Sequence, residues 1–252
     1  MMNIIDSDQY LAAVELKREN VSFDRYPFSL PVIKTLTSLK LHPKVTFFIG
    51  ENGSGKSTFL EAVAVACGFN PEGGSKNFSF STCQTHSGLY EKLRLVRGVS
   101  RPRDGYFLRA ESFYNVATNI DELDKEPSRD PQIIGAYGGE SLHHKSHGEA
   151  FFALFMNRLN GNGLYLLDEP EAALSPTRQL AFLSRLHDLV GRHSQFIIAT
   201  HSPLIMAYPD SVIYEFGESG IRSVAYEQTE QFGVYKSFFT DYKRFFYEII
   251  NN

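Results

Sequence analysis

The sequence has little of several features that each mark a particular class of protein. Only two cysteines occur, Cys67 and Cys83, and they match no zinc-binding spacing, which favours a reduced, cytosolic setting. No apolar run approaches the roughly 20 residues that are needed to span a bilayer. Asp6 and Asp8 stand where a secretory signal would carry a basic and then an apolar stretch. We therefore expect a cytoplasmic protein without direct membrane insertion.

Positive charge is not in excess either. The 252 residues include 25 Lys and Arg against 29 Asp and Glu, which gives a net charge of -4. A chain of this balance is not a polycation that coats nucleic acid, so any such contact needs a local patch of basic residues. The length suffices for one large domain or two small ones.

Apolar runs predict buried strands that alternate with helices. The runs are apolar on both faces, which is typical of strands in a covered parallel sheet. The expected strands are residues 45–49, 164–167 and 196–199. Helical patterns cover residues 58–67, 151–159 and 176–190, and residues 212–226 fit a hairpin. Residues 11–16 fit a strand or a short helix equally well. The alternation indicates an α/β protein with helices on both faces of its sheet.

A glycine-rich segment between the first of these strands and the first helix carries the main chemical signal. Residues 50–58 read Gly-Glu-Asn-Gly-Ser-Gly-Lys-Ser-Thr and fit the phosphate-loop pattern G-x-x-x-x-G-K-S/T. Its glycines let backbone N–H groups approach phosphate oxygens, and the following helix directs its positive end there. We expect Lys56 to bridge the β- and γ-phosphates of ATP and Ser57 to ligate Mg²⁺. The predicted nucleotide-binding residues are Asn52, Gly53, Ser54, Gly55, Lys56, Ser57 and Thr58.

The second expected strand ends in two acids, Asp168 and Glu169, which precede Pro170. A carboxylate at the end of a strand beside a phosphate loop is suited to hold Mg²⁺, so Asp168 joins Ser57 as a predicted metal residue. Glu169 is placed to polarise an attacking water as a general base. The two acids complete the second half of a predicted ATP hydrolysis site.

In this order, the motifs resemble those of the ABC-type P-loop ATPases. The resemblance includes the Glu-Ala-Ala-Leu-Ser-Pro segment at 171–176 and the Ile-Ala-Thr-His-Ser-Pro segment at 198–203. The Asp-Glu-Pro-Glu and Ala-Thr-His-Ser-Pro sequences look most like stand-alone AAA family ATPases related to SMC, recombination-mediator and OLD-type proteins. They look less like transporter subunits. The resemblance spans residues 45 to about 205 of the chain.

The resemblance implies a fold and further roles. The implied fold is a P-loop NTPase of the ABC-ATPase type, with a mainly parallel sheet flanked by helices, an antiparallel N-terminal β part and a small helical lobe. It implies one domain over residues 1–252, with the lobe at about 84–160 inserted in the nucleotide-binding core. His201 matches the switch histidine that contacts the γ-phosphate. The implied catalytic residues are thus Glu169, His201 and Lys56.

The segment Lys-Ser-His-Gly-Glu at 145–149 is similar to the SMC-like form of the family's signature motif. The resemblance implies that Ser146 and Gly148 bind ATP that is held by a second copy. One chain cannot reach its own phosphate with this element, so a homodimer on ATP binding is implied. The neighbouring His143 and His144, with His147, indicate a polar loop rather than a metal site.

Two family features are left open by the sequence. Residues 105–113 lie where the family has its glutamine loop but contain no glutamine, so either Arg109 or Glu111 would take that role, and Gln84 lies too early. The adenine-stacking residue is Phe23, Tyr26 or Phe28.

The implied activity is Mg²⁺-dependent ATP hydrolysis coupled to dimerisation, in a switch that acts on nucleic acid or a protein effector, as in DNA repair or phage defence. The alternatives are the energy-coupling ATPase subunit of a membrane transporter and a regulator that only binds ATP. The basic cluster is nucleic-acid-binding, partner-binding or merely solvated, and it comprises Lys92, Arg94, Arg97, Arg101, Arg103 and Arg109. Aromatic residues at helical spacing between Phe238 and Ile250 predict core packing, with partner docking as the alternative.

Overall fold

A six-stranded sheet forms the centre of the computed structural model, which describes residues 9–76, 87–125 and 132–251. The strand order is β5-β6-β7-β3-β8-β9, and all neighbours are parallel except the hairpin pair β8 and β9. The strands are β3 (Val45–Gly50), β5 (Asp104–Arg109), β6 (Gly163–Asp168), β7 (Gln195–Ala199), β8 (Ser211–Gly217) and β9 (Gly220–Val224). This arrangement confirms the predicted parallel sheet, its three buried strands and the C-terminal hairpin. Asp6, Asp8, Cys83 and Gln84 lie outside the described residues.

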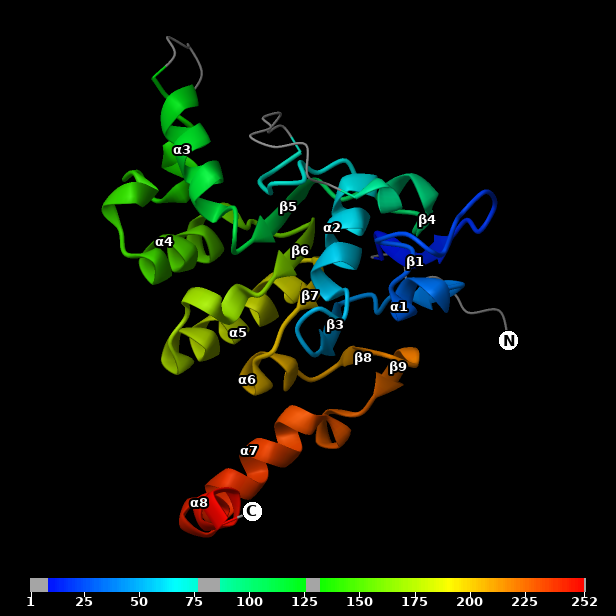
Figure 1. Ribbon diagram of the computed structural model, residues 1–252. Helices are drawn as coiled ribbons and strands as arrows, with labels where there is room; N and C mark the ends of the chain where they lie inside the picture. The colour runs from blue at the N-terminus through cyan, green and yellow to red at the C-terminus, as the bar shows by residue number, and fades with distance from the viewer. Residues whose placement is uncertain (1–8, 77–86, 126–131, 252) are drawn as a thin grey trace.

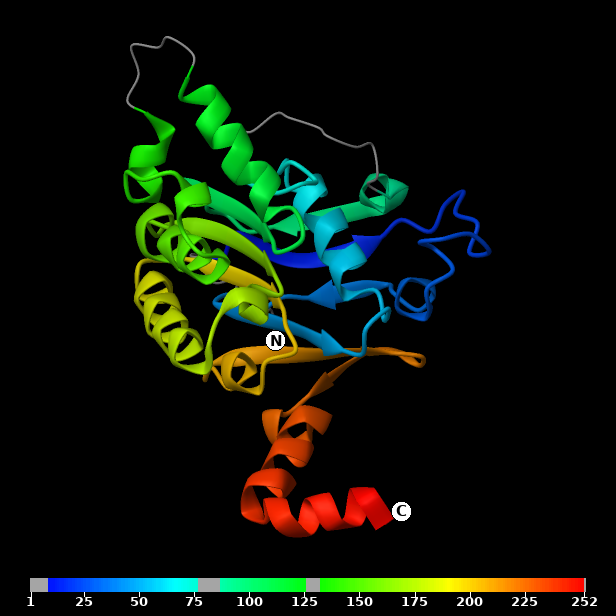
Figure 2. The ribbon, with the colours of Figure 1, turned by 60° about the vertical axis from the view of Figure 1, so that its left-hand side comes forward.

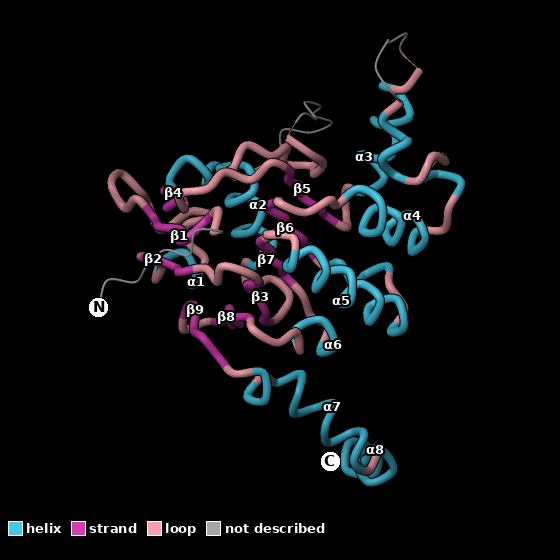
Figure 3. Tube along the Cα trace, turned by 180° about the vertical axis from the view of Figure 1, so that it is seen from behind, coloured by secondary structure: helices cyan, strands magenta, loops and turns pink. Residues whose placement is uncertain are grey.

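The expected antiparallel N-terminal part is a second, three-stranded sheet with the order β2-β1-β4 (Figure 3). It consists of β1 (Leu11–Leu16), β2 (Ser38–Lys40) and β4 (Leu93–Arg97), and the short helix α1 (Pro31–Lys34) precedes β2. Residues 11–16 are thus a strand, because both of their edges are paired with other strands.

Two apolar cores cover the two faces of the large sheet, which explains the all-apolar strands. On β6, Leu164 and Leu166 face α2 (Lys56–Ala66) and the small sheet, whereas Tyr165 and Leu167 face α5 (Pro176–Gly191). Figure 1 shows α2 on one side of the strands and α5 on the other. The helix expected at 58–67 begins two residues earlier, at Lys56.

The helices of the predicted lobe pack at the β5 edge of the sheet (Figure 1). They are α3 (Phe113–Leu123), the short turns η2 (Ile133–Tyr137) and η3 (Leu142–His144), α4 (His147–Ala153) and the π-helical η4 (Leu154–Arg158). The first part of the range 84–160 supplies β4 and β5 to the two sheets, which moves the start of the helical part to Phe113. The helix expected at 151–159 begins at His147, because Ser146 and Glu149 form a capping box there.

An arm of two helices leaves the body after β9 (Figure 2). The short helix α6 (Pro203–Met206) lies between β7 and β8, and the turn η6 (Tyr226–Gln228) joins β9 to the arm. The arm consists of α7 (Glu230–Thr240) and α8 (Tyr242–Asn251). Neither arm helix has a buried residue, so the expected core packing of residues 238–250 is wrong. No helix in the described part of the chain is long and apolar enough to cross a membrane.

Candidate nucleotide site

Three glycines shape the loop that joins β3 to α2. Gly50, Gly53 and Gly55 have φ angles of +138°, +80° and +97°, which L side chains rarely adopt. A Cβ atom at Gly50 would lie 2.2 Å from the carbonyl oxygen of Phe216 on the neighbouring strand β8. The backbone conformation of the loop therefore favours glycine at each of these three positions.

Lys56 is a buried cation at the first turn of α2. Its side chain folds back onto the loop, where Nζ donates to the carbonyl oxygens of Gly50 and Glu51, each at 2.8 Å. Only 4% of the residue is exposed, and this burial lowers the pKa of Lys56 while nearby carboxylates, Glu169 first, oppose the shift. A desolvated ammonium with few charged partners is suited to receive the anionic phosphates of a nucleotide.

Ser57 and Asp168 lie together although 111 residues separate them in the chain. Ser57 Oγ donates to Asp168 Oδ1 at 3.0 Å. Burial raises the pKa of Asp168 to about 7, partly offset by the hydrogen bond from Ser57. Two oxygens about 2.9 Å apart can be adjacent ligands of one octahedral Mg²⁺ with bonds of roughly 2.05 Å. The pair therefore fits the metal that the sequence predicts.

Glu169 and His201 flank this pair at the ends of β6 and β7. Glu169 has a φ of +50°, and its Oε1 lies 3.8 Å from His201 Nε2, which is beyond hydrogen-bond distance. His201 Nε2 has no hydrogen-bond partner among the described residues, and burial lowers the pKa of His201. An imidazole and a carboxylate thus stand beside the loop, and His201 has a ring nitrogen without a hydrogen-bond partner among the described residues.

Glu171 is a residue that the sequence reasoning did not single out. Its Oε1 accepts the backbone N–H of His201 at 2.5 Å, so it fixes the turn that carries the histidine. Burial raises the pKa of Glu171. The signal in the sequence was the last acid of the Asp-Glu-Pro-Glu turn.

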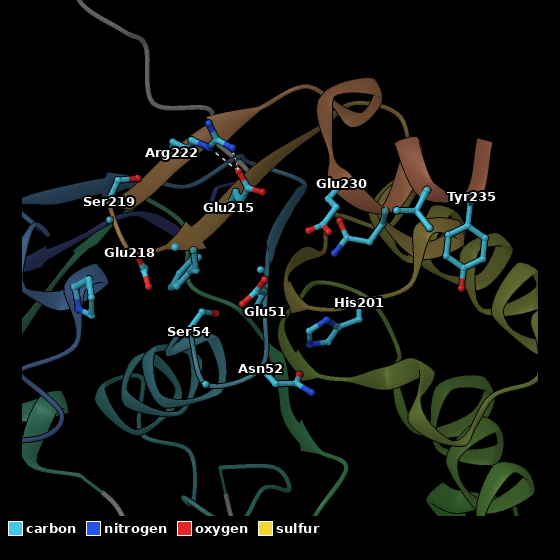
Figure 4. A pocket seen from close by; sticks show the side chains of 18 residues that line it. Glu51, Asn52, Ser54, His201, Glu215, Glu218, Ser219, Arg222, Glu230 and Tyr235 are labelled. Carbon is cyan, nitrogen blue, oxygen red and sulfur yellow. Dashed lines mark hydrogen bonds and ion pairs between the residues drawn. The ribbon is translucent and has the colours of Figure 1, made fainter. Parts of the chain in front are cut away.

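A cleft of about 940 Å³ opens beside the loop (Figure 4). Asn52 and Ser54 line one side, His201 lies nearby, and the β8–β9 hairpin with the start of α7 forms the remainder. Ser54 Oγ is buried and has no hydrogen-bond partner in the part of the chain that the structure describes. Such an orphaned polar atom in a phosphate loop fits an absent polar ligand.

Two family models match the sequence over the segments that form this site. One, described as "AAA domain", matches residues 29–125, and the other, described as "AAA domain, putative AbiEii toxin, Type IV TA system", matches residues 149–207. The first match contains the phosphate loop, and the second contains Asp168, Glu169 and His201. Over these two segments the chain therefore resembles P-loop ATPases with AAA domains. No curated protein sequence matches it.

Solved structures of ABC transporters and of an SMC head domain are similar to this chain in fold. A structure described as an inward-facing metal-chelate type ABC transporter is 16% identical, with a TM-score of 0.50 over 90% of this chain and 88% of that chain. The SMC head domain from Thermotoga maritima is 18% identical, with a TM-score of 0.44 over 86% and 100% of the two chains. A nucleotide-free ATP-binding cassette from an ABC transporter is 16% identical, with a TM-score of 0.49 over 84% and 90%. The predicted resemblance in family and fold is confirmed.

Ser146 and Gly148 lie at the start of α4, on the opposite face of the sheet from α2. Ser146 Oγ lies 2.7 Å from Glu149 Oε2 and is exposed. A Cβ at Gly148 would lie 2.4 Å from the carbonyl oxygen of Ala173, so α4 packs tightly on the turn η5 (Pro170–Ala173). Neither Ser146 nor Gly148 lines the pockets around the phosphate loop of its own chain.

Arg109 and Glu111 are the two residues that the sequence offered for the glutamine position of the family that the chain resembles. The structure places Arg109 beside the nucleotide site. It ends β5 in register with Asp168, and it forms an ion pair with Glu61 of α2 at 2.5 Å. Glu111 is 82% exposed and lies at 3.2 Å from the other guanidinium nitrogen. Arg109 is therefore not part of the exposed basic surface. That surface lies on β4 and the following loop and comprises Arg94, Arg97, Arg101 and Arg103.

Among the three aromatic candidates for adenine stacking, Tyr26 adjoins the phosphate loop. Its hydroxyl lies 3.0 Å from Thr58 Oγ1, and the side chain is 66% exposed. Phe23 and Phe28 are partly buried against the core of the small sheet. The available ring face next to the loop thus belongs to Tyr26.

No group of three or more His, Cys, Asp or Glu is placed to hold a metal ion among the described residues. In the polar loop before α4, His143 Nε2 lies 3.1 Å from Thr118 Oγ1.

Proposed function

We propose that the protein binds ATP with Mg²⁺ and hydrolyses it at a site that a second copy completes. The observation that carries the proposal is the meeting of Lys56, Ser57 and Asp168 at the ends of β3 and β6. A buried ammonium beside two oxygen ligands is the chemistry that a metal-bound triphosphate requires.

Within this site, the loop backbone from Asn52 to Thr58 and the positive end of α2 hold the phosphates. Lys56 exchanges its carbonyl partners for phosphate oxygens, and Ser57 with Asp168 holds the Mg²⁺, which neutralises charge on the β- and γ-phosphates when bound. Tyr26 offers a ring to the adenine.

Glu169 and His201 do the chemical work in this proposal. Glu169 accepts the proton of the attacking water as a general base. His201 donates from its unpaired Nε2 to the γ-phosphate, and Glu171 keeps its backbone in place. The tautomer with the proton on Nε2 is required for this role.

The second copy supplies Ser146 and Gly148. Ser146 is exposed, and both residues lie at the start of α4 on the far face of the sheet, which supports a partner's nucleotide as their target rather than their own. We further propose that the closed and open pairs switch a nucleic acid or a protein effector. The exposed arginines of β4 and the following loop support the former partner.

The hydrolysis is tested with Glu169→Gln, which keeps the shape of the side chain and removes the base. Phosphate release should fall about hundredfold or more, while binding of ATP with Mg²⁺ is retained. Lys56→Ala should abolish binding, and Glu227→Gln, an exposed carboxylate away from the loop, should behave like the wild type. Release at the wild-type rate by the Glu169→Gln variant would contradict the assigned base. Wild-type release no higher than that of Lys56→Ala would identify a protein that only binds ATP.

A further inference from the structure

The arm, residues 230–251, is anchored to the body at its base. The ring of Phe232 packs on Tyr226 at 5.0 Å, and the Tyr226 hydroxyl donates to the carbonyl of Pro203 at 2.9 Å. Beyond this point α7 and α8 extend into solvent (Figures 1 and 2).

An aromatic corner holds the two arm helices against each other. The ring of Phe238 on α7 contacts those of Tyr242, Phe245 and Phe246 on α8, with centroids at 6.4, 5.7 and 6.4 Å. Phe238 and Phe245 are consequently half-buried although the body does not cover them. The arm is thus a built feature with its own packing, and its remaining apolar side chains face outward.

The outward face of α8 is a continuous apolar stripe. Tyr242, Phe246, Ile249 and Ile250 share one side of the helix and are 54%, 53%, 61% and 73% exposed. Arg244 and Glu248 lie on the opposite side, where they form an ion pair at 2.8 Å. The helix therefore has one side suited to water and one suited to an apolar partner.

The exposed apolar area matches what one partner contributes to a stable interface. Val234, Tyr235 and Phe239 of α7 add exposed fractions of 46%, 47% and 74% to the stripe. Together with α8 the arm exposes on the order of 1,000 Å² of mainly apolar side chains, since an aromatic side chain covers about 150–250 Å². A standard interface takes about 800 Å² from each partner.

The charge of the arm argues for a protein partner rather than a phosphate-rich surface. Its three basic residues are balanced by three acidic ones, and these are Lys236, Lys243, Arg244, Glu230, Asp241 and Glu248. Binding to anionic membranes or nucleic acid depends on an excess of positive charge, which the arm does not have. A neutral apolar stripe can pair with itself in a two-fold arrangement.

The arm also begins on the nucleotide face of the molecule. Glu230 and Tyr235 of α7 line the same cleft as Asn52 and Ser54 of the phosphate loop (Figure 4). The second copy that closes on that face would therefore bring its own arm to the same side.

We infer that the arms of two copies pack on each other through the α8 stripe and hold the protein as a dimer without nucleotide. The pairing is separate from ATP-driven closure of the phosphate loops on the partner's Ser146. Its consequence is a high effective concentration of the two nucleotide faces, so that closure becomes a step within one complex.

The test is the solution mass of the full chain without nucleotide, measured by light scattering or sedimentation over a dilution series. The variant is Phe246→Ser with Ile250→Ser, which removes two exposed side chains of the stripe. The matched control is Arg244→Ser with Glu248→Ser, which makes two serine changes on the polar side of the same helix and leaves its net charge unchanged. Thermal unfolding and ATP binding of all three proteins check that the body stays folded.

The wild type and the control should be dimers without nucleotide, and the stripe variant should dissociate at a concentration about a hundredfold higher or more. A monomeric wild type would overturn the inference, as would a stripe variant that dimerises like its control. Capture of the wild type on phosphatidylcholine–phosphatidylserine vesicles, lost in the stripe variant, would overturn it in favour of a lipid surface. Adding Glu169→Gln to the stripe variant separates the two contacts, because ATP with Mg²⁺ should then turn a monomer into a dimer whether or not the arm inference holds.

Discussion

Replacing Asp168 by asparagine should make the nucleotide-free protein more stable at neutral pH. Burial raises the pKa of this carboxyl from 3.8 to about 7, so the folded state holds a proton that the unfolded chain releases. A folded-state pKa above the unfolded value stabilises at low pH, and this stability is lost as pH rises from about 4 to about 7. The shift corresponds to at most about 4 kcal/mol, at about 1.4 kcal/mol per pKa unit.

Asparagine does not titrate and still accepts the hydrogen bond from Ser57, so the variant escapes this loss. Its free energy of unfolding relative to the wild type should grow by about 1–3 kcal/mol between pH 5 and pH 8 and then level off. Urea unfolding at pH 5, 6, 7 and 8, with chelator and without nucleotide, measures the difference. Asp24→Asn, a change to an exposed carboxylate, should give a flat profile. A difference that is independent of pH, or that shrinks as pH rises, would refute the reasoning.

Two further predictions follow from contacts around the site. Gly148→Ala places a Cβ 2.4 Å from the Ala173 carbonyl, so α4 must shift from η5, and phosphate release should fall at least about tenfold with ATP binding retained; Gly191→Ala, which meets nothing within 4 Å, is the control, and an equal effect there would contradict the account. Arg109→Leu leaves the 8% exposed Glu61 without its ion pair and should cost about 3–5 kcal/mol in urea unfolding. Adding Glu61→Gln should recover most of this loss, and no recovery would show that the pair does not set the stability.

The strands and the phosphate loop were readable from the sequence because local physics determines them. A parallel sheet with two covered faces needs apolar residues on both faces, as Leu164 to Leu167 of β6 show, and the loop needs glycine where φ is positive. The start of α4 was also readable, since Ser146 and Glu149 carry the spacing of a capping box. The helix was nevertheless expected to begin later, because its start was placed at Phe151, the first residue of the apolar run.

Long-range pairing explains what the sequence left open. Arg109 reaches the site through the register of β5 on β6, which joins residues 59 positions apart, so neither Arg109 nor Glu111 could be favoured beforehand. Tyr26 differs from Phe23 and Phe28 in exposure, which depends on the packing of the small sheet. The expectation that the arm helices pack in the core was wrong, because periodicity reveals an apolar face but not what covers it.

The central claim is that each ATP site combines the phosphate loop of one copy with Ser146 and Gly148 of the other. It is tested most directly by mixing Lys56→Ala, which spoils the loop, with Ser146→Arg, which spoils the opposing element, and measuring phosphate release. A mixed pair then contains one intact site, so an equal mixture of two inactive variants should recover about a quarter of the wild-type rate if copies exchange freely. A mixture no more active than its separate components, with exchange of copies verified by mass, would contradict the shared site.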